Sequence, residues 1–124
     1  MDERTGSEKV KREEELDQKF LTSGQEKIKL EIALIRYFEI EKEDDLKAVY
    51  QKYLLRRFRP AMEVLLEKKE NKKMRQLFLE KEMSQGLLEE LLSMASKRHN
   101  TEAFVWLLAQ KETLYGFEKG DMEL

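Results

Sequence analysis

The chain has 124 residues, of which 40% are apolar and 40% are charged. This length suits one compact domain, and the formal net charge of -2 lacks the basic excess that marks a nucleic-acid-binding domain. The absence of cysteine excludes disulfides and thiolate metal sites. The longest apolar run, residues 103–109, is much shorter than the roughly 20 residues that span a bilayer, and the first residues lack the apolar core of a secretory signal. We therefore expect a cytoplasmic protein that does not contact a membrane.

The remaining composition favours helices throughout. One proline and five glycines leave few turn signals of the kind that separate strands, and good helix formers such as Leu, Glu, Lys and Gln prevail. Residues 1–24 are dense in charge, and their few apolar residues, among them Phe20 and Leu21, give only a weak helical stripe. We expect this segment to be either a partly disordered charged leader or a capping helix, closed by Gly24.

Two longer amphipathic helices are predicted next, the first from Gln25 and the second from Glu43. The first carries apolar residues at helical spacing, namely Ile28, Ile32, Ile35 and Phe38. The second starts with an acidic turn, which favours the positive end of the helix dipole. Its apolar stripe consists of Leu46, Val49, Tyr50, Tyr53, Leu54 and Phe58. Pro60 should end it, because proline disfavours helical geometry in the residue before it.

Four shorter helices complete the prediction. They cover residues 61–69, 72–82, 85–98 and 102–111. Gly116 is predicted to stop the last of them, and residues 116–124 form an acidic tail. The chain should thus hold six to seven helices.

A weak internal repeat organises the later helices. Residues 71–81 align with residues 100–110 at an offset of 29, which places Asn71 opposite Asn100. In each copy a leucine-rich helix precedes the asparagine turn and an amphipathic helix follows it, so each copy predicts an antiparallel helical hairpin. Such hairpins stack to bury their apolar faces. We therefore predict an all-α fold, a short α-solenoid of stacked hairpins over residues 25–115.

The stretch from residue 94 to 109 resembles the central part of an ankyrin repeat. Ala95 and Ser96 match the small-residue pair of that family, His99 and Asn100 stand at its turn, and Leu107 is followed by a second leucine as in its second helix. The stretch is also similar to ankyrin-like tails of uncharacterised proteins from anaerobic Gram-positive bacteria. The resemblance covers about residues 59–115 and implies a helical-repeat fold that binds other proteins.

The sequence departs from the ankyrin pattern in three places. His99 replaces the family's turn glycine, and the Thr-Pro-Leu-His opening of its first helix is missing. Only residues 83–85 separate the two hairpins, which is too short for the family's β-finger. We therefore expect an ankyrin-like stack without β-fingers.

No constellation of residues indicates catalysis. His99 is the only histidine, so a zinc site or a Ser-His hydrolase would have to depend on it alone, and a turn position is the simpler interpretation. The five glycines are scattered and form no phosphate-binding loop. The acidic clusters lie on polar faces or at helix starts, where solvated charge explains them. We predict no enzymatic activity, no cofactor and no metal.

Local charge and one aromatic side chain supply the candidate binding residues. Residues 56–75 contain eight basic and three acidic residues, and the turns near residues 71 and 99 should meet at one end of the stack. Trp106 is either a core residue or a half-exposed interface anchor. The candidate binding residues are Arg56, Arg57, Arg59, Lys68, Lys69, Lys72, Lys73, Lys97, Arg98 and Trp106.

The leading functional hypothesis is a non-catalytic protein–protein interaction module of unknown partner. The alternative is a nucleic-acid-associated accessory or regulatory protein that uses the basic segment 56–75. A homodimer is a further alternative, and the chain could be a piece of a longer protein, because the end faces of a short solenoid need cover.

Overall fold

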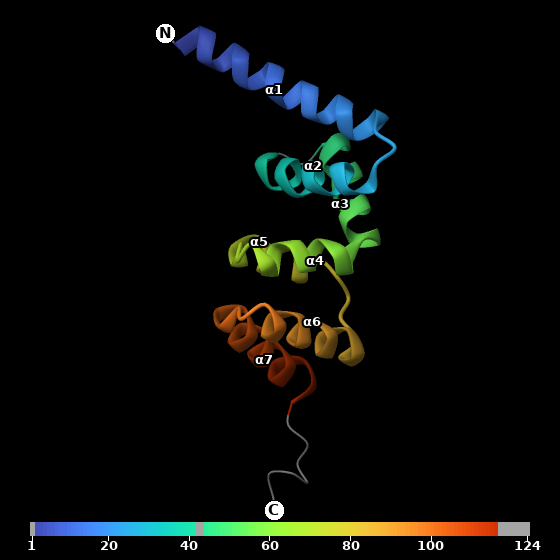
Figure 1. The fold of residues 1–124 in the computed structure, drawn as a ribbon, viewed down its shortest axis with the longest axis vertical. Helices are drawn as coiled ribbons and strands as arrows, with labels where there is room; N and C mark the ends of the chain where they lie inside the picture. Colours follow the sequence, from blue (N-terminus) through green and yellow to red (C-terminus); the bar gives the residue numbers. More distant parts are fainter. Residues whose placement is uncertain (1, 42–43, 117–124) are drawn as a thin grey trace, which may run out of the picture. The chain divides into compact units, whose positions relative to one another are not determined.

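The computed structural model describes residues 2–41 and 44–116, and all of their regular secondary structure is α-helical. The helices are α1 (Asp2–Thr22), α2 (Glu26–Glu39), α3 (Asp45–Arg56), α4 (Phe58–Glu67), α5 (Asn71–Phe78), α6 (Gln85–Lys97) and α7 (Thr101–Tyr115), as Figure 1 shows. The all-α prediction is therefore confirmed. The chain divides into two compact units, Met1–Ala61 and Met62–Leu124. The predicted acidic tail lies outside the described residues apart from Gly116.

The first unit is built by α1, α2 and α3 around aromatic side chains. Phe20 near the end of α1 is buried, and its ring lies 4.6 Å from the ring of Tyr50 and 5.1 Å from that of Tyr53, both on α3. The ammonium group of Lys29 on α2 lies 4.6 Å from the centre of the Phe20 ring and donates to the Phe20 carbonyl at 3.0 Å. Phe20 thus joins all three helices of this unit.

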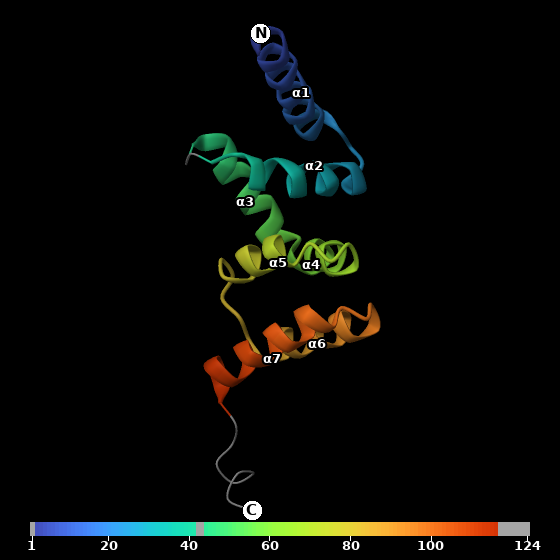
Figure 2. The same ribbon diagram turned by 90° about the vertical axis from the view of Figure 1, so that its left-hand side faces the viewer.

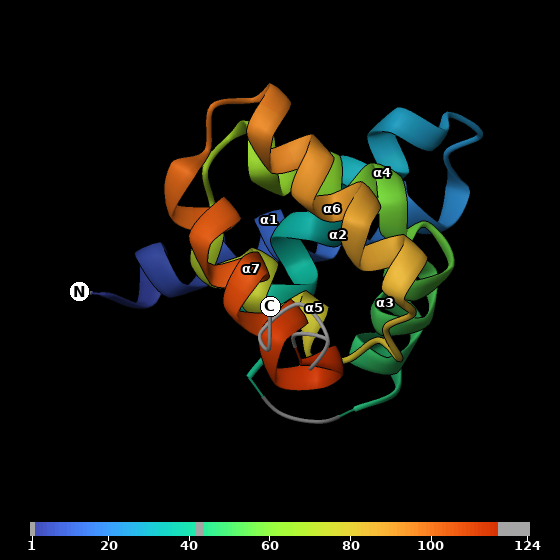
Figure 3. The ribbon, with the colours of Figure 1, turned by 90° about the horizontal axis from the view of Figure 1, so that it is seen from below.

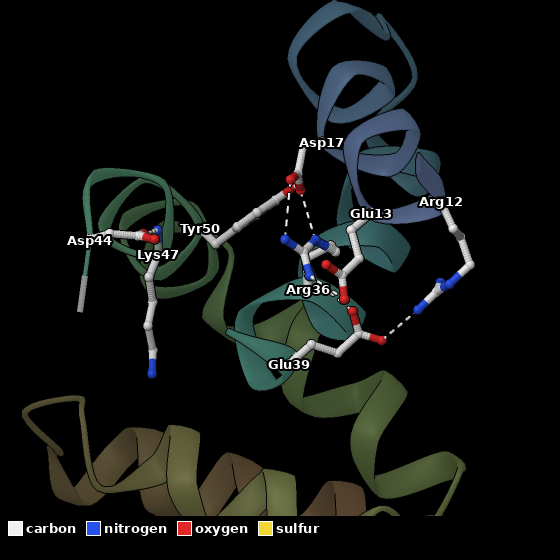
Figure 4. A network of polar contacts seen from close by, with 8 residues as sticks. All are labelled: Arg12, Glu13, Asp17, Arg36, Glu39, Asp44, Lys47 and Tyr50. Atoms are coloured by element: carbon white, nitrogen blue, oxygen red, sulfur yellow. Dashed lines mark hydrogen bonds and ion pairs between the residues drawn. The ribbon is translucent and has the colours of Figure 1, made fainter. Parts of the chain in front are cut away.

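A buried arginine adds a polar connection between the same helices (Figure 4). Arg36 on α2 forms two hydrogen bonds with the Asp17 carboxylate on α1, from Nε at 2.8 Å and from Nη2 at 3.1 Å. The Tyr50 hydroxyl on α3 donates to the same carboxylate at 2.5 Å. The hydrogen bond to Asp17 raises the pKa of Arg36, and burial followed by the Asp17 hydrogen bond raises the pKa of Tyr50. Both groups therefore keep their protons at neutral pH.

Glu39 extends this network to the surface. It accepts from Arg36 at 3.0 Å and from Arg12 at 2.8 Å. Burial alone would raise the pKa of Glu39, but the hydrogen bonds from the two arginines outweigh burial and lower it. The charge of Arg36 is thus shared between two carboxylates, which compensates for its removal from water.

The junction between α3 and α4 differs from the prediction. The break falls at Arg57 rather than at Pro60, and Pro60 is the third residue of α4. A proline is tolerated in the first turn, because the N–H groups there have no partner within the helix. The predicted helix boundary was therefore three residues too late.

The second unit contains two helical hairpins, which we call the first hairpin (α4 with α5) and the second hairpin (α6 with α7). Figures 1 and 2 both show α6 and α7 next to α5 and the end of α4. Asn71 begins α5, and the predicted continuation of this helix to residue 82 is wrong. Leu79, which was predicted to lie on its apolar face, is 70% exposed. The last helix ends before Gly116, whose φ of 67° fits the predicted stop.

Both hairpin turns have the same backbone geometry. Lys69 and His99 have φ values of 57° and 53°. The next amide bonds five residues back, from Glu70 to Leu65 in one turn and from Asn100 to Ala95 in the other, each at 2.9 Å. This pattern is a Schellman turn. The structural repeat therefore has an offset of 30, whereas the sequence alignment gave 29.

The turn geometry predicts that glycine stabilises both turns. A left-handed conformation costs a residue with a side chain about 1 kcal/mol, which glycine avoids. We expect His99→Gly and Lys69→Gly each to raise the free energy of unfolding by about 1 kcal/mol in urea titrations. Lys97→Gly, within α6, is the control and should lower it. A destabilised His99→Gly variant would contradict this interpretation of the turn.

The buried arginine gives a second prediction. Asp17→Ala leaves Arg36 in the interior without its main partner, which should lower the free energy of unfolding by about 3 kcal/mol. Glu14→Ala removes an exposed carboxylate from the same helix and should change it by less than about 0.5 kcal/mol. Urea unfolding followed by circular dichroism measures both. Equal effects of the two substitutions would show that the network does not stabilise the first unit.

Candidate functional site

The two hairpins of the second unit are joined through the side chain of Asn100, which is 2% exposed. Its amide nitrogen donates to the Leu66 carbonyl at 3.0 Å and to Asn71 Oδ1 at 2.8 Å. Its oxygen accepts from the Ala103 N–H at 3.1 Å and from Asn71 Nδ2 at 3.2 Å. Every donor and acceptor of this amide is used, and one side chain both caps α7 and holds the second hairpin on the first.

Further contacts surround this amide pair. Asn71 Nδ2 also donates to Glu102 at 3.2 Å, and Arg75 lies 3.8 Å from the same carboxylate. Arg98 forms an ion pair with Glu63 at 3.3 Å. The rings of Phe78 and Trp106 pack edge to face at 5.1 Å. The first hairpin therefore presents a contact face to the second, consisting of Glu63, Leu66, Asn71, Arg75 and Phe78.

The offset of 30 identifies the matching face of the second hairpin. Thirty residues after the contact face stand Ser93, Ser96, Thr101, Val105 and Leu108. We call these five residues the end face, and all of them are exposed. On α7 they recur at i, i+4 and i+7, the spacing of one helical face. Phe78 in the first hairpin is 3% exposed, whereas its counterpart Leu108 is 43% exposed and Val105 is 59% exposed.

A hollow of about 280 Å³ opens beside the end face. It is lined by Ala95, Ser96, His99, Asn100, Thr101 and Phe104. Figure 3 views the second unit from the side on which α6 and α7 lie in front of α5. In the first hairpin the residues thirty positions earlier include Leu66 and Asn71, which the Asn100 side chain contacts. The hollow is thus the counterpart of the place that Asn100 fills in the first hairpin.

Trp106 and Arg98, both predicted binding residues, have partners in the second unit. Trp106 is part-buried against Phe78. Arg98 contacts Glu63 and donates to the Met94 carbonyl at 3.4 Å, while its buried Nε finds no hydrogen-bond partner among the described residues. These two residues therefore contribute to the packing of the second hairpin on the first.

The predicted basic residues fall in both units. Lys69, Lys72 and Lys73 line a surface hollow of about 450 Å³ together with Glu70, Asn71, Arg75 and Glu102. Lys73 lies 3.5 Å from Glu70, and Arg75 pairs with Glu102. Lys68 and Lys97 are exposed in the same unit. The hollow carries four basic and two acidic residues, and the acidic residues offset part of its charge.

The first unit contains the other three basic candidates, Arg56, Arg57 and Arg59, all exposed. Arg57 forms an ion pair with Glu26 at 3.2 Å. Arg56 lines a hollow of about 310 Å³ together with Phe20, Lys29, Ala48, Val49, Lys52 and Tyr53. Burial and a hydrogen bond to Glu26 raise the pKa of Tyr53 to about 12. The tyrosine is therefore neutral and cannot act as a base at neutral pH.

Sequence reasoning missed the end face. Val105 and Leu108 were placed in a run of apolar residues that looked like core, and the offset of 29 matched each residue with the wrong counterpart. An offset of 30, with His99 matched to Lys69, was the available signal. It would have paired Leu108 with the buried Phe78.

Comparisons with family models, curated proteins and solved structures found no match. Within residues 2–41 and 44–116, no group of three or more metal-ligating side chains could hold an ion. No helix in the described part of the chain is both long and apolar enough to cross a bilayer.

The connection made by Asn100 can be tested against a matched cap. Ser84 caps α6 by accepting the Leu87 N–H at 3.1 Å but makes no contact with the first hairpin in the described structure. We expect Ser84→Ala to lower the free energy of unfolding by about 1 kcal/mol. Asn100→Ala should lower it by about 3 kcal/mol, because it also leaves the Leu66 carbonyl and the Asn71 amide unpaired. Equal losses in urea titrations would show that Asn100 acts only as a helix cap.

Proposed function

We propose that this chain is a non-catalytic protein-binding module and that the end face of its second hairpin is the binding surface. The observation that carries the proposal is the exposure of Val105 and Leu108 on a helix face whose counterpart in the first hairpin is covered. Exposed apolar side chains in a contiguous patch are typical of protein interfaces. The partner is another protein, and the proposal includes a cytoplasmic location.

The ankyrin-like character of the chain is part of this proposal. Supporting it are two stacked hairpins without strands in the described residues and the left-handed His99 at the position of the family's turn glycine. Repeat proteins of this kind bind partners through surfaces that several hairpins share. The proposal assigns no enzymatic role, since the polar groups described above connect helices to one another.

Nucleic-acid binding is the weaker candidate. The hollow at Lys69 and Lys72 favours an anion, but Glu70 and Glu102 lie in the same hollow and pair with its other cations. Binding to phosphates needs an uncompensated positive surface. The apolar end face has no such opposing feature.

The test compares two substitutions of exposed leucines. Leu108→Glu places a charge in the proposed interface, whereas Leu21→Glu places the same charge on an exposed position of the first unit. We expect a protein captured from cell extract by the unaltered chain to be retained by Leu21→Glu and to bind Leu108→Glu at least about tenfold more weakly, since desolvating the new charge costs more than about 1.4 kcal/mol.

Two results would contradict the proposed function. One is a captured partner that binds Leu108→Glu as tightly as the unaltered chain. The other is salt-sensitive binding of a labelled DNA or RNA duplex that is lost when Lys69 and Lys72 are changed to glutamate and kept in Leu108→Glu. The second result would establish the nucleic-acid alternative.

A further inference from the structure

We infer that the partner bound at the end face is a helical hairpin of another protein, stacked in the register in which the second hairpin stacks on the first. This inference rests on the proposed function and names the chemistry of the partner. The first hairpin and its occupant serve as the template. Each contact between them identifies a group on the end face that the partner must meet.

The backbone acceptor for the partner's amide is already present. Leu66 and Ser96 are counterparts in the two turns, and their carbonyls accept the N–H groups of Lys69 and His99 at 3.2 and 3.0 Å. The Leu66 carbonyl takes a second donor, the Asn100 amide. No amide side chain of the described residues reaches the Ser96 carbonyl. A carbonyl has two lone pairs, so the hollow beside Ser96 suits an amide side chain from the partner's turn.

The end face differs from its template in charge. Ser93 stands where the first hairpin has Glu63, and Val105 stands where it has Arg75. In the template these two charged residues meet Arg98 and Glu102 of the second hairpin. The partner therefore carries uncharged residues two positions before and two positions after its amide. A charge there would be desolvated without a counterion.

The apolar part of the end face suits a large side chain. Phe78 is covered by the Trp106 ring at 5.1 Å, and Leu108 is the counterpart of Phe78. Trp106 lies six residues after Asn100. The partner thus combines an amide in the residue before its second helix with an aromatic or large aliphatic residue six positions later.

A second copy of this chain does not supply this chemistry. Its turns offer two such amides, Asn71 and Asn100, and both are buried and bonded to each other. Delivering either one to a neighbouring copy would break the pair that holds the two hairpins together. The occupant is therefore a different protein.

The experiment builds a third hairpin from the chain itself. A second copy of residues 79–108 is inserted after Leu108, which continues the offset of 30, and the inserted copy carries Glu102→Leu to suit Val105. We expect amide exchange in the original turn, residues 96–101, to slow about tenfold because that turn becomes covered. Adding Asn100→Ala to the inserted copy should return exchange to the rate of the unaltered chain.

A binding measurement guards against failure of the insertion to fold. A fluorescent peptide of residues 79–115 with Glu102→Leu is titrated into the unaltered full chain. Saturable binding that Thr101→Arg weakens at least about tenfold supports the inference. The Leu21→Glu chain is the matched control and should bind the peptide normally.

The outcomes separate this inference from the proposed function. Unchanged exchange in the insertion chain together with no peptide binding overturns the inference. If a cellular partner still depends on Leu108, the proposed function stands and only the hairpin register is wrong. A dimer of the unaltered chain that light scattering detects and that Leu108→Glu dissociates would show a second copy to be the occupant, and it would also overturn the inference.

Discussion

The second unit depends on one buried amide. Asn100 is almost completely removed from water and would be costly there unless each of its polar atoms had a partner. It finds those partners at the start of its own helix, in the Leu66 carbonyl and in Asn71. A shift of one residue along either hairpin would break several of these bonds together. The amide pair therefore fixes the register of the stack, whereas apolar packing between helices tolerates small slips.

This register gives the end of the stack its chemistry. Because both turns are built alike, the second hairpin repeats the acceptors and apolar positions that the first hairpin uses to hold it. The repetition is incomplete, since Ser93 and Val105 replace the charged Glu63 and Arg75. The end face is consequently less polar than the contact face that it repeats. A surface of this kind favours a protein partner over a phosphate backbone.

The first unit solves the same problem of joining helices with different groups. Arg36, Asp17 and Tyr50 come from three helices and meet in one hydrogen-bonded cluster beside the Phe20 ring (Figure 4). A buried ion pair of this kind is an uncertain source of stability, but removing one partner is costly, so it specifies which helices meet. The raised pKa of Arg36 and the lowered pKa of Glu39 reflect structural pairing of their charges.

The sequence by itself determined that the chain is helical, how many helices it has and roughly where they lie, because helical periodicity and capping are local properties. It also indicated the paired hairpins and the stop at Gly116. Tertiary structure alone decided which apolar residues are covered. Val105 and Leu108 read like core residues in the sequence, yet they are exposed because the described second unit contains no third hairpin to cover them. It also decided the register, since matching the two asparagines by type suggested an offset of 29, whereas the left-handed residues and the Schellman hydrogen bonds set it at 30. That choice depends on bonds between residues about thirty positions apart, which no local pattern encodes.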